Sequence, residues 1–150
     1  MAEIDTRVEK VLGPNDAPGA ESAGADWSAA NQRYLRAALD LVRGCLEQPQ
    51  DGREPSAPIQ AELTLQFAAS QLPAPSALDA LCADFNLSPF ERNVLLLCAG
   101  LELDGGFGPL FAAGHGDPQK PYPTFSLALA KLPDPHWSAL TPESALRRWR

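Results

Sequence analysis

The sequence lacks the features of a membrane-spanning or exported protein. It has no run of about 18 apolar residues, so we expect no membrane-spanning helix. The first residues, Met1 to Asp5, have neither the basic start nor the apolar stretch of a secretory signal. Cysteine is scarce, at positions Cys45, Cys82 and Cys98 only. Without export we expect reduced thiols, and these absences together predict a cytoplasmic protein.

Basic side chains are also few. The chain has 12 Lys and Arg against 19 Asp and Glu, which gives a formal net charge of −7. Affinity for duplex DNA depends largely on Lys and Arg side chains that neutralise phosphates. The acidic balance therefore argues against nucleic acid as the partner.

Motifs of catalysis, cofactor binding and metal binding are missing. There is no G-x-x-x-x-G-K-[ST] phosphate loop, and the glycine-rich stretch at 105–108 matches no dinucleotide fingerprint. The three cysteines are separated by 37 and 16 residues, unlike the close pairs of zinc sites. His115 and His136 have no carboxylate or cysteine at triad or ligand spacing. We therefore predict no catalytic, cofactor or metal residues, and no enzyme activity for this chain.

Proline, in contrast, is abundant, with 15 in 150 residues. Because proline breaks helix interiors, short elements must lie between these positions. Residues 13–26 contain only small or polar side chains and no branched apolar one, which indicates a flexible linker. We expect a short helix before it, at 1–12. The predicted division is thus a flexible amino-terminal segment at 1–26 and a folded domain at 27–150.

The spacing of apolar residues predicts a mainly α fold, a compact bundle of several helices. Residues 29–48 place their apolar side chains at i, i+3, i+4 and i+7, with Asp26 or Ser28 as the cap and Pro49 as the stop. Structure should begin near Asp26. Further helices or helical turns are expected at 76–86, 88–103, 107–113, after Thr124, at 136–140 and from Thr141 onward.

The helix opened by Ser88 has the clearest start signal. Ser88 can cap with its hydroxyl, Pro89 suits the first helical position, and Glu91 completes a capping box. Its apolar side chains point nearly all round, so we expect it to be the central and most buried helix.

Residues 59–67 leave two interpretations open. Apolar and polar residues alternate strictly from Ile59 to Phe67, which is the periodicity of a strand. The same residues are good helix formers, and Ala68 and Ala69 continue that trend. The bundle therefore includes at most a short strand or hairpin near 59–67.

A candidate interaction surface follows from the carboxyl-terminal half. The proline-rich loops should leave an apolar patch around Phe107 to Tyr122, and the last helix carries the chain's one basic cluster. The residues that we predict for this surface are Phe107, Phe111, Tyr122, Arg147 and Arg148. The chain also stops within an amphipathic helix, which suggests that it is part of a longer protein.

Several short strings, in order, carry a resemblance to a known family. They are Ala30 to Leu35, Leu87 to Arg92, Leu95 to Gly100, Glu102 to Asp104, Gly116 to Pro118, Pro123 to Phe125, Leu127 to Ala130 and His136 to Pro142. Together they resemble the amino-terminal region of bacterial AAA+ ATPases that accompany gene clusters for extracellular contractile injection systems, which are phage-tail-like particles. The resemblance covers residues 27–150.

The resemblance implies a winged-helix variant that precedes a nucleotide-binding module. It implies no nucleotide-binding residue in this chain, so ATP and Mg are expected for the parent protein only. The resemblance also implies that the parent protein assembles as a hexameric ring. The domain itself would recruit a protein partner or adaptor, such as a component of the injection system. The alternative is a nucleic-acid-binding winged helix. That function needs a basic recognition helix, whereas the stretch from Ser88 to Leu103 offers only Arg92.

Overall fold

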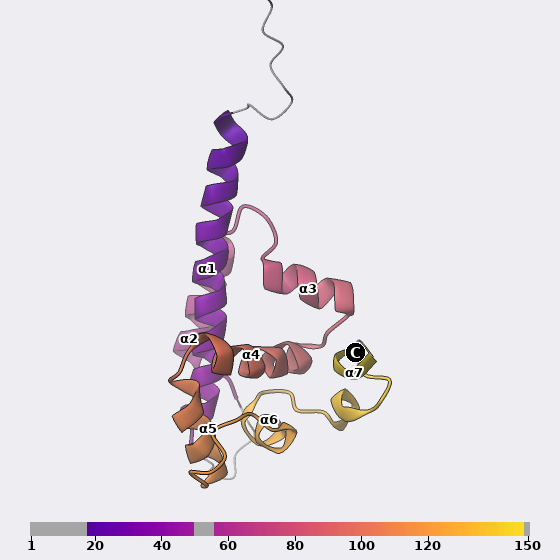
Figure 1. The fold of residues 1–150 in the computed structure, drawn as a ribbon. Helices are drawn as coiled ribbons and strands as arrows, with labels where there is room; N and C mark the ends of the chain where they lie inside the picture. Colours follow the sequence, from indigo (N-terminus) through magenta and orange to yellow (C-terminus); the bar gives the residue numbers. More distant parts are fainter. Residues whose placement is uncertain (1–17, 50–55, 149–150) are drawn as a thin grey trace, which may run out of the picture.

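The computed structural model of the protein describes residues 18–49 and 56–148, with side chains from residue 24 onward. This part of the chain consists of helices joined by loops and contains no strand (Figure 1). The elements are α1 (Pro18–Glu47), α2 (Ile59–Ser70), α3 (Ala77–Phe85), α4 (Pro89–Leu103), α5 (Phe107–His115), α6 (Phe125–Lys131), the 3₁₀ helix η1 (Trp137–Leu140) and α7 (Ala145–Arg148). The prediction of a mainly α bundle is confirmed.

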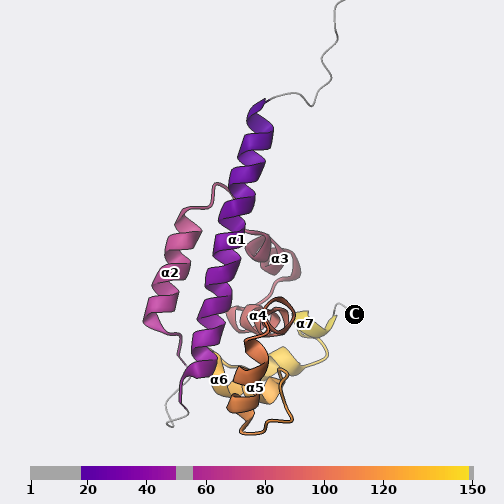
Figure 2. The ribbon, with the colours of Figure 1, turned by 60° about the vertical axis from the view of Figure 1, so that its left-hand side comes forward.

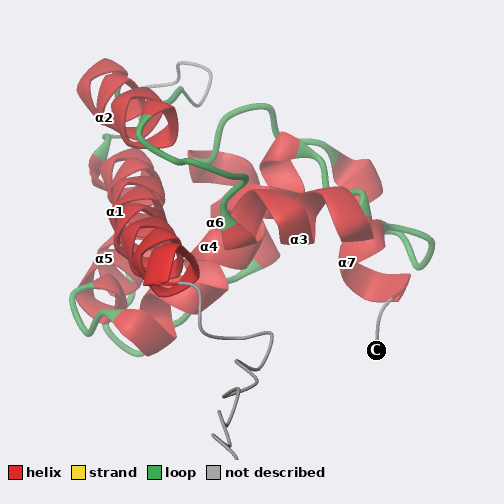
Figure 3. Ribbon diagram, turned by 90° about the horizontal axis from the view of Figure 1, so that it is seen from above, coloured by secondary structure: helices red, strands yellow, loops and turns green. Residues whose placement is uncertain are grey.

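Helix α1, with 30 residues, is the axis of the molecule. Helix α2 runs back along it, and its amino-terminal end meets α1 where Pro58 lies against Gly44 (Figure 2). Helices α4 and α5 also contact α1, and α6 contacts both of them. Viewed from above, α2 packs against α1 and lies at the edge of the molecule (Figure 3).

The predicted start of the first helix was wrong. We expected structure from Asp26, but α1 is already helical from Pro18. Residues 18–26 are rich in alanine, the best helix former, and proline suits a first helical turn. The expected helix at 1–12 and the first part of the expected linker lie outside the described residues. The division of the chain at residue 26 stays a prediction.

Residues 59–67 form a helix, α2, which settles the alternative that the sequence left open. Its partly buried side chains, including Ala61, Leu65 and Ala68, repeat at helical spacing, and Leu65 packs against the core. A strand would need a neighbouring strand to satisfy its backbone groups, and the described residues contain none.

Helix α4 is central, as predicted, and buries Phe90, Val94, Leu96 and Leu97. Its capping box is present: the Glu91 amide donates to Ser88 Oγ at 3.2 Å, and the Ser88 amide donates to Glu91 Oε2 at 2.9 Å. The helix is not buried all round, however. Cys98 is exposed and Leu103 is 62% exposed, because no described element covers the outer side of its last turns.

Two glycines let neighbouring helices approach closely. A Cβ atom at Gly100 of α4 would lie 2.7 Å from the Phe107 ring of α5. One at Gly114 of α5 would lie 2.8 Å from Leu127 of α6. The hydroxyls of Ser76 and Thr124 also accept amide hydrogen bonds, at the starts of α3 and α6. These features bring α4, α5 and α6 together at one end of α1.

No helix among the described residues combines the length and the apolar character that crossing a lipid bilayer demands.

Candidate interaction surfaces

The single arginine of α4 is engaged inside the domain. Arg92 Nη2 donates to Tyr34 Oη at 3.1 Å, and the Tyr34 hydroxyl donates to Asp79 Oδ1 at 2.8 Å. The Arg92 guanidinium also lies 4.0 Å from the Asp79 carboxylate. Burial, together with the hydrogen bond to Asp79, raises the pKa of Tyr34. This cluster ties α1, α3 and α4 together, so Arg92 is not free to meet a phosphate.

A serine and a histidine lie together near the start of α4. Ser88 Oγ is 2.9 Å from His136 Nε2, and His136 Nδ1 is 2.8 Å from Ser138 Oγ. The Ser88 hydroxyl also accepts the Glu91 amide as the helix cap, and the Glu91 carboxylate accepts the Ser88 amide. A catalytic serine and histidine would need a third group, usually a carboxylate, that orients the histidine and stabilises its positive charge. Here a hydroxyl occupies that place, and the chain of hydrogen bonds fastens the segment before η1 to α4.

The ring of His136 strengthens the same attachment. Its centroid lies 5.2 Å from that of Phe90, the buried first-turn aromatic of α4. His136 therefore packs the segment before η1 against α4.

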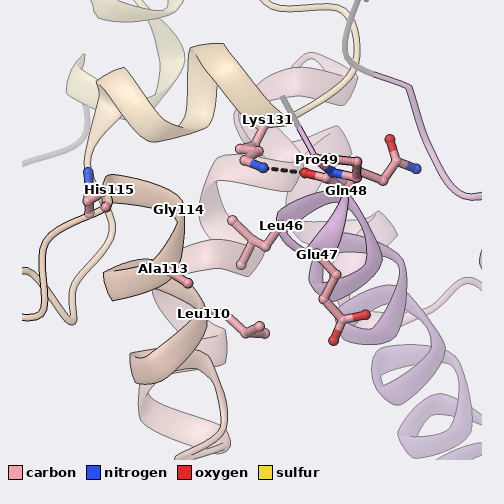
Figure 4. Close-up of a pocket in the computed structure, with 10 residues that line it drawn as sticks. Leu46, Glu47, Gln48, Pro49, Leu110, Ala113, Gly114, His115 and Lys131 are labelled. Atoms are coloured by element: carbon pink, nitrogen blue, oxygen red, sulfur yellow. Dashed lines mark hydrogen bonds between the residues drawn. The ribbon is translucent and has the colours of Figure 1, made fainter. Parts of the chain in front are cut away.

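A cavity of about 630 Å³ lies between the end of α1, α5 and α6 (Figure 4). Its walls include Leu46, Leu110 and Ala113, and Lys131 of α6 reaches across it. Lys131 is only 8% exposed, and its ammonium donates a hydrogen bond to the carbonyl of Gln48 just after α1. A cation there balances the negative end of the helix dipole, so Lys131 acts as a cap for α1.

The cavity brings no catalytic constellation together. Its one histidine, His115, has its Nε2 atom 3.2 Å from the carbonyl of Tyr122. Over the described residues, no group of three or more His, Cys, Asp or Glu side chains could hold a metal ion. Burial raises the pKa of the Cys45 thiol to about 11, so at neutral pH this thiol is protonated and inert.

The outer face of α2 carries three large apolar side chains that are exposed. Ile59, Leu63 and Phe67 are 77%, 52% and 69% exposed. They lie four residues apart, so they form one stripe on the side that faces away from α1. A helix that is apolar on both sides is normally covered on both sides, which marks this stripe as a contact surface.

The predicted interaction surface is only partly at the surface. Phe107 and Phe111 are 0% exposed, so their assignment to it was wrong. Their rings pack against each other with centroids 5.8 Å apart, and the Arg43 guanidinium covers the Phe107 ring. Phe107 and Phe111 belong to the core because they lie in a short helix that packs on α1. Burying the large apolar area of their rings there is more favourable than exposing it to water beside a loop.

The other three predicted residues are exposed but not joined in one patch. Tyr122, 46% exposed, precedes α6 and lies beside His115. Arg147 and Arg148 are in α7, on the other side of the molecule from α5 (Figures 1 and 3). Each of these arginines donates to a nearby backbone carbonyl, Arg147 to Leu140 at 3.0 Å and Arg148 to Glu143 at 3.4 Å. Their role in an interaction stays a prediction.

The stripe on α2 was not predicted from the sequence. The four-residue spacing of Ile59, Leu63 and Phe67 is visible there, but the same stretch also alternates between apolar and polar residues, which left strand and helix both open. Apolar periodicity cannot by itself distinguish the face that packs on the core from one that remains open.

Comparison with known families now identifies the fold. A family model described as a winged helix domain, variant, matches residues 29–136. The chain belongs to this family. No curated protein and no solved structure matches it. The winged-helix variant domain thus runs from within α1 to the residue before η1, and it includes α2 with its exposed stripe. Arg147 and Arg148 lie outside the matched residues.

Proposed function

We propose that this winged-helix variant is a non-catalytic protein-interaction domain that contacts another protein chain through the outer face of α2. The observation that carries the proposal is the stripe of Ile59, Leu63 and Phe67. Apolar surface of this kind gains free energy when another protein removes it from water.

The electrostatics of the domain support protein rather than nucleic acid as the partner. Nucleic-acid recognition by a helix requires basic side chains that are free to reach phosphates or bases. In α4 the buried side lies in the core, and the lone Arg92 is held by Tyr34 and Asp79. The net charge of −7 adds repulsion from a phosphate backbone.

We further propose that the domain precedes the nucleotide-binding module of an AAA+ ATPase. This part of the proposal rests on the resemblance of residues 27–150 to ATPases that accompany contractile injection systems. ATP and Mg would then act outside this chain, in a hexameric ring. The domain would recruit a protein substrate or adaptor, such as a component of the injection system, for assembly or remodelling. A calorimetric titration of this chain with ATP should give no binding signal.

Photo-crosslinking in cells that carry the neighbouring genes tests the contact. Phe67 is replaced by the photoreactive analogue p-benzoylphenylalanine, and the matched control carries it at Leu103, which is 62% exposed at the end of α4. We expect a discrete protein adduct from position 67, identified by mass spectrometry, and none from position 103. An adduct with nucleic acid at either position, or equal labelling at both, contradicts the proposal.

A further inference from the structure

The outer face of α2 carries no charge. At about 100° per residue, the side chains within roughly 60° of Leu63 on the wheel occupy a sector of about 120°, one third of the helix circumference. They are Ile59, Gln60, Leu63, Gln66, Phe67 and Ser70, all exposed and all uncharged. In a chain with a net charge of −7, this is a surface where a second acidic molecule meets no like charge.

The face is also symmetrical about its middle. Leu63 lies four residues from both Ile59 and Phe67. If two such helices pack antiparallel with Leu63 of both at the centre, Ile59 of each lies level with Phe67 of the other. Each end then presents an aromatic ring next to a β-branched side chain, and the two Leu63 side chains meet in the middle. A two-fold interface requires a surface of this self-complementary kind.

We propose that the chain covering this face is a second copy of the same protein, joined by an antiparallel pair of α2 helices around Leu63. The inference rests on the proposed use of α2 as a protein contact and names its partner. The position of α2 at the edge of the molecule leaves room for the second helix (Figure 3). A paired domain would present every other surface twice, which raises the avidity for a recruited target.

The area of the stripe sets the strength of the pair. From the exposed fractions of Ile59, Leu63 and Phe67, each copy offers on the order of 300 Å² of apolar side chain. Even with the polar rim, the total falls below the roughly 1,200 Å² at which stable interfaces begin. The dimer is therefore weak and concentration-dependent, with a dissociation constant between about 10 µM and 1 mM.

Analytical ultracentrifugation of the full chain over a concentration series tests the pairing. The wild type should change from monomer to dimer as its concentration rises to about 1 mM. Leu63→Arg should weaken association at least about tenfold, because it brings two cations together at the two-fold axis. Leu103→Arg is the matched control, since it removes a leucine elsewhere that is 62% exposed, against 52% for Leu63, and its association should equal that of the wild type. A wild-type chain that stays monomeric throughout overturns the inference.

Cysteine substitution tests the register, with Cys98→Ser as the background because Cys98 is exposed. Leu63→Cys should form an intermolecular disulfide under mild oxidation, since the two positions meet at the axis. Ile59→Cys should not, because the two copies of position 59 would be about 12 Å apart along the helices. The double variant with cysteine at both 59 and 67 should crosslink again. Equal crosslinking of the 59 and 63 single variants overturns the antiparallel register.

The experiments also separate this inference from the proposed function. If position 67 crosslinks to a different protein while the purified chain stays monomeric, the inference fails and the protein-contact function stands. If neither a protein adduct nor a dimer is found, both fail. Val8→Asp changes the amino-terminal segment of the chain. If it weakens association as much as Leu63→Arg, the amino-terminal segment and not a second α2 covers the outer face of α2, and the inference is overturned.

Discussion

The guanidinium of Arg43, near the end of α1, forms an ion pair with the carboxylate of Asp104, the residue that follows α4. Asp104 also accepts the amide of Gly106 at 2.8 Å and so shapes the turn into α5. An acidic residue at the carboxyl end of a helix opposes the helix dipole, so this carboxylate gains from contact with a cation on another element. The contact is Arg43, whose guanidinium also covers the ring of Phe107.

Lowering the pH below the ordinary pKa range of carboxyl groups should destabilise the fold through protonation of Asp104. The hydrogen bond from Gly106, followed by the Arg43 interactions, holds the pKa of Asp104 below its ordinary value of 3.8. A pKa that is lower in the folded state gives stability above the ordinary value and loses it as the pH falls through the folded-state pKa. We expect the Tm to decrease below about pH 4.

The control is Asp104→Asn, which should flatten this dependence without abolishing it. Asp117 is also shifted, because its hydrogen bond from Gln119 lowers its pKa. The double variant Asp104→Asn and Asp117→Asn should flatten the acid limb further than either single change. A wild-type Tm that is constant between pH 5 and pH 2 would contradict the assignment.

Gly100→Ala should destabilise the domain by about 1–3 kcal/mol, because the new Cβ overlaps the rigid Phe107 ring. In an open helix position the same change stabilises by about 1 kcal/mol through helix propensity, so the sign of the effect reports the contact. Urea denaturation gives the free energy of unfolding. Gly105→Ala, at a position with nothing within 4 Å of a Cβ, is the control and should change it far less.

Ser88→Ala should cost about 1–2 kcal/mol of unfolding free energy, because it removes the cap of the central helix. Ser76→Ala removes a cap that has no histidine partner and should cost less. A double-mutant cycle of Ser88→Ala with His136→Phe isolates the coupling between the two side chains. Strict additivity would show that the Ser88 to His136 hydrogen bond does not fasten η1 to α4.

Leu97→Asp should leave the chain unfolded, since Leu97 is 1% exposed in α4 and a charge buried there has no partner. Circular dichroism would show loss of the cooperative melt. Leu103→Asp, at a 62% exposed position of the same helix, is the control and should melt cooperatively near the wild-type temperature. A wild-type melt for Leu97→Asp would remove α4 from the core.

Local signals in the sequence predicted most of the helices. Ser88 with Glu91, Ser76 and Thr124 are caps whose side-chain oxygens act on the amides that follow within one turn, so neighbouring residues suffice to recognise them. The burial of α4 followed from its leucine-rich composition in the same way.

The features that the sequence did not predict depend on how the helices pack in the tertiary structure. Phe107 and Phe111 were predicted at the surface because the proline-rich loops were expected to leave an apolar patch there. Both are buried, and the close approach at Gly100 brings Phe107 against α4. Cys98 lies in the helix that we expected to be the most buried, yet it is exposed because no described helix covers that side. Which face of α2 stays open depends on where α1 lies, and the alternation from Ile59 to Phe67 contains no information on that.

The order in which the helices of the core follow one another along the chain has a consequence for synthesis on the ribosome. Helices α1 and α2 are near neighbours in sequence, whereas the Tyr34 to Asp79 and Arg43 to Asp104 contacts close loops of 45 and 61 residues. The helical hairpin of α1 and α2 can therefore form early. Ala38, Val42 and Cys45 stay uncovered until α4 and α5 have been synthesised and pack against them. At about 5–20 residues per second, that nascent apolar face stays open for several seconds, long enough for a chaperone to engage it.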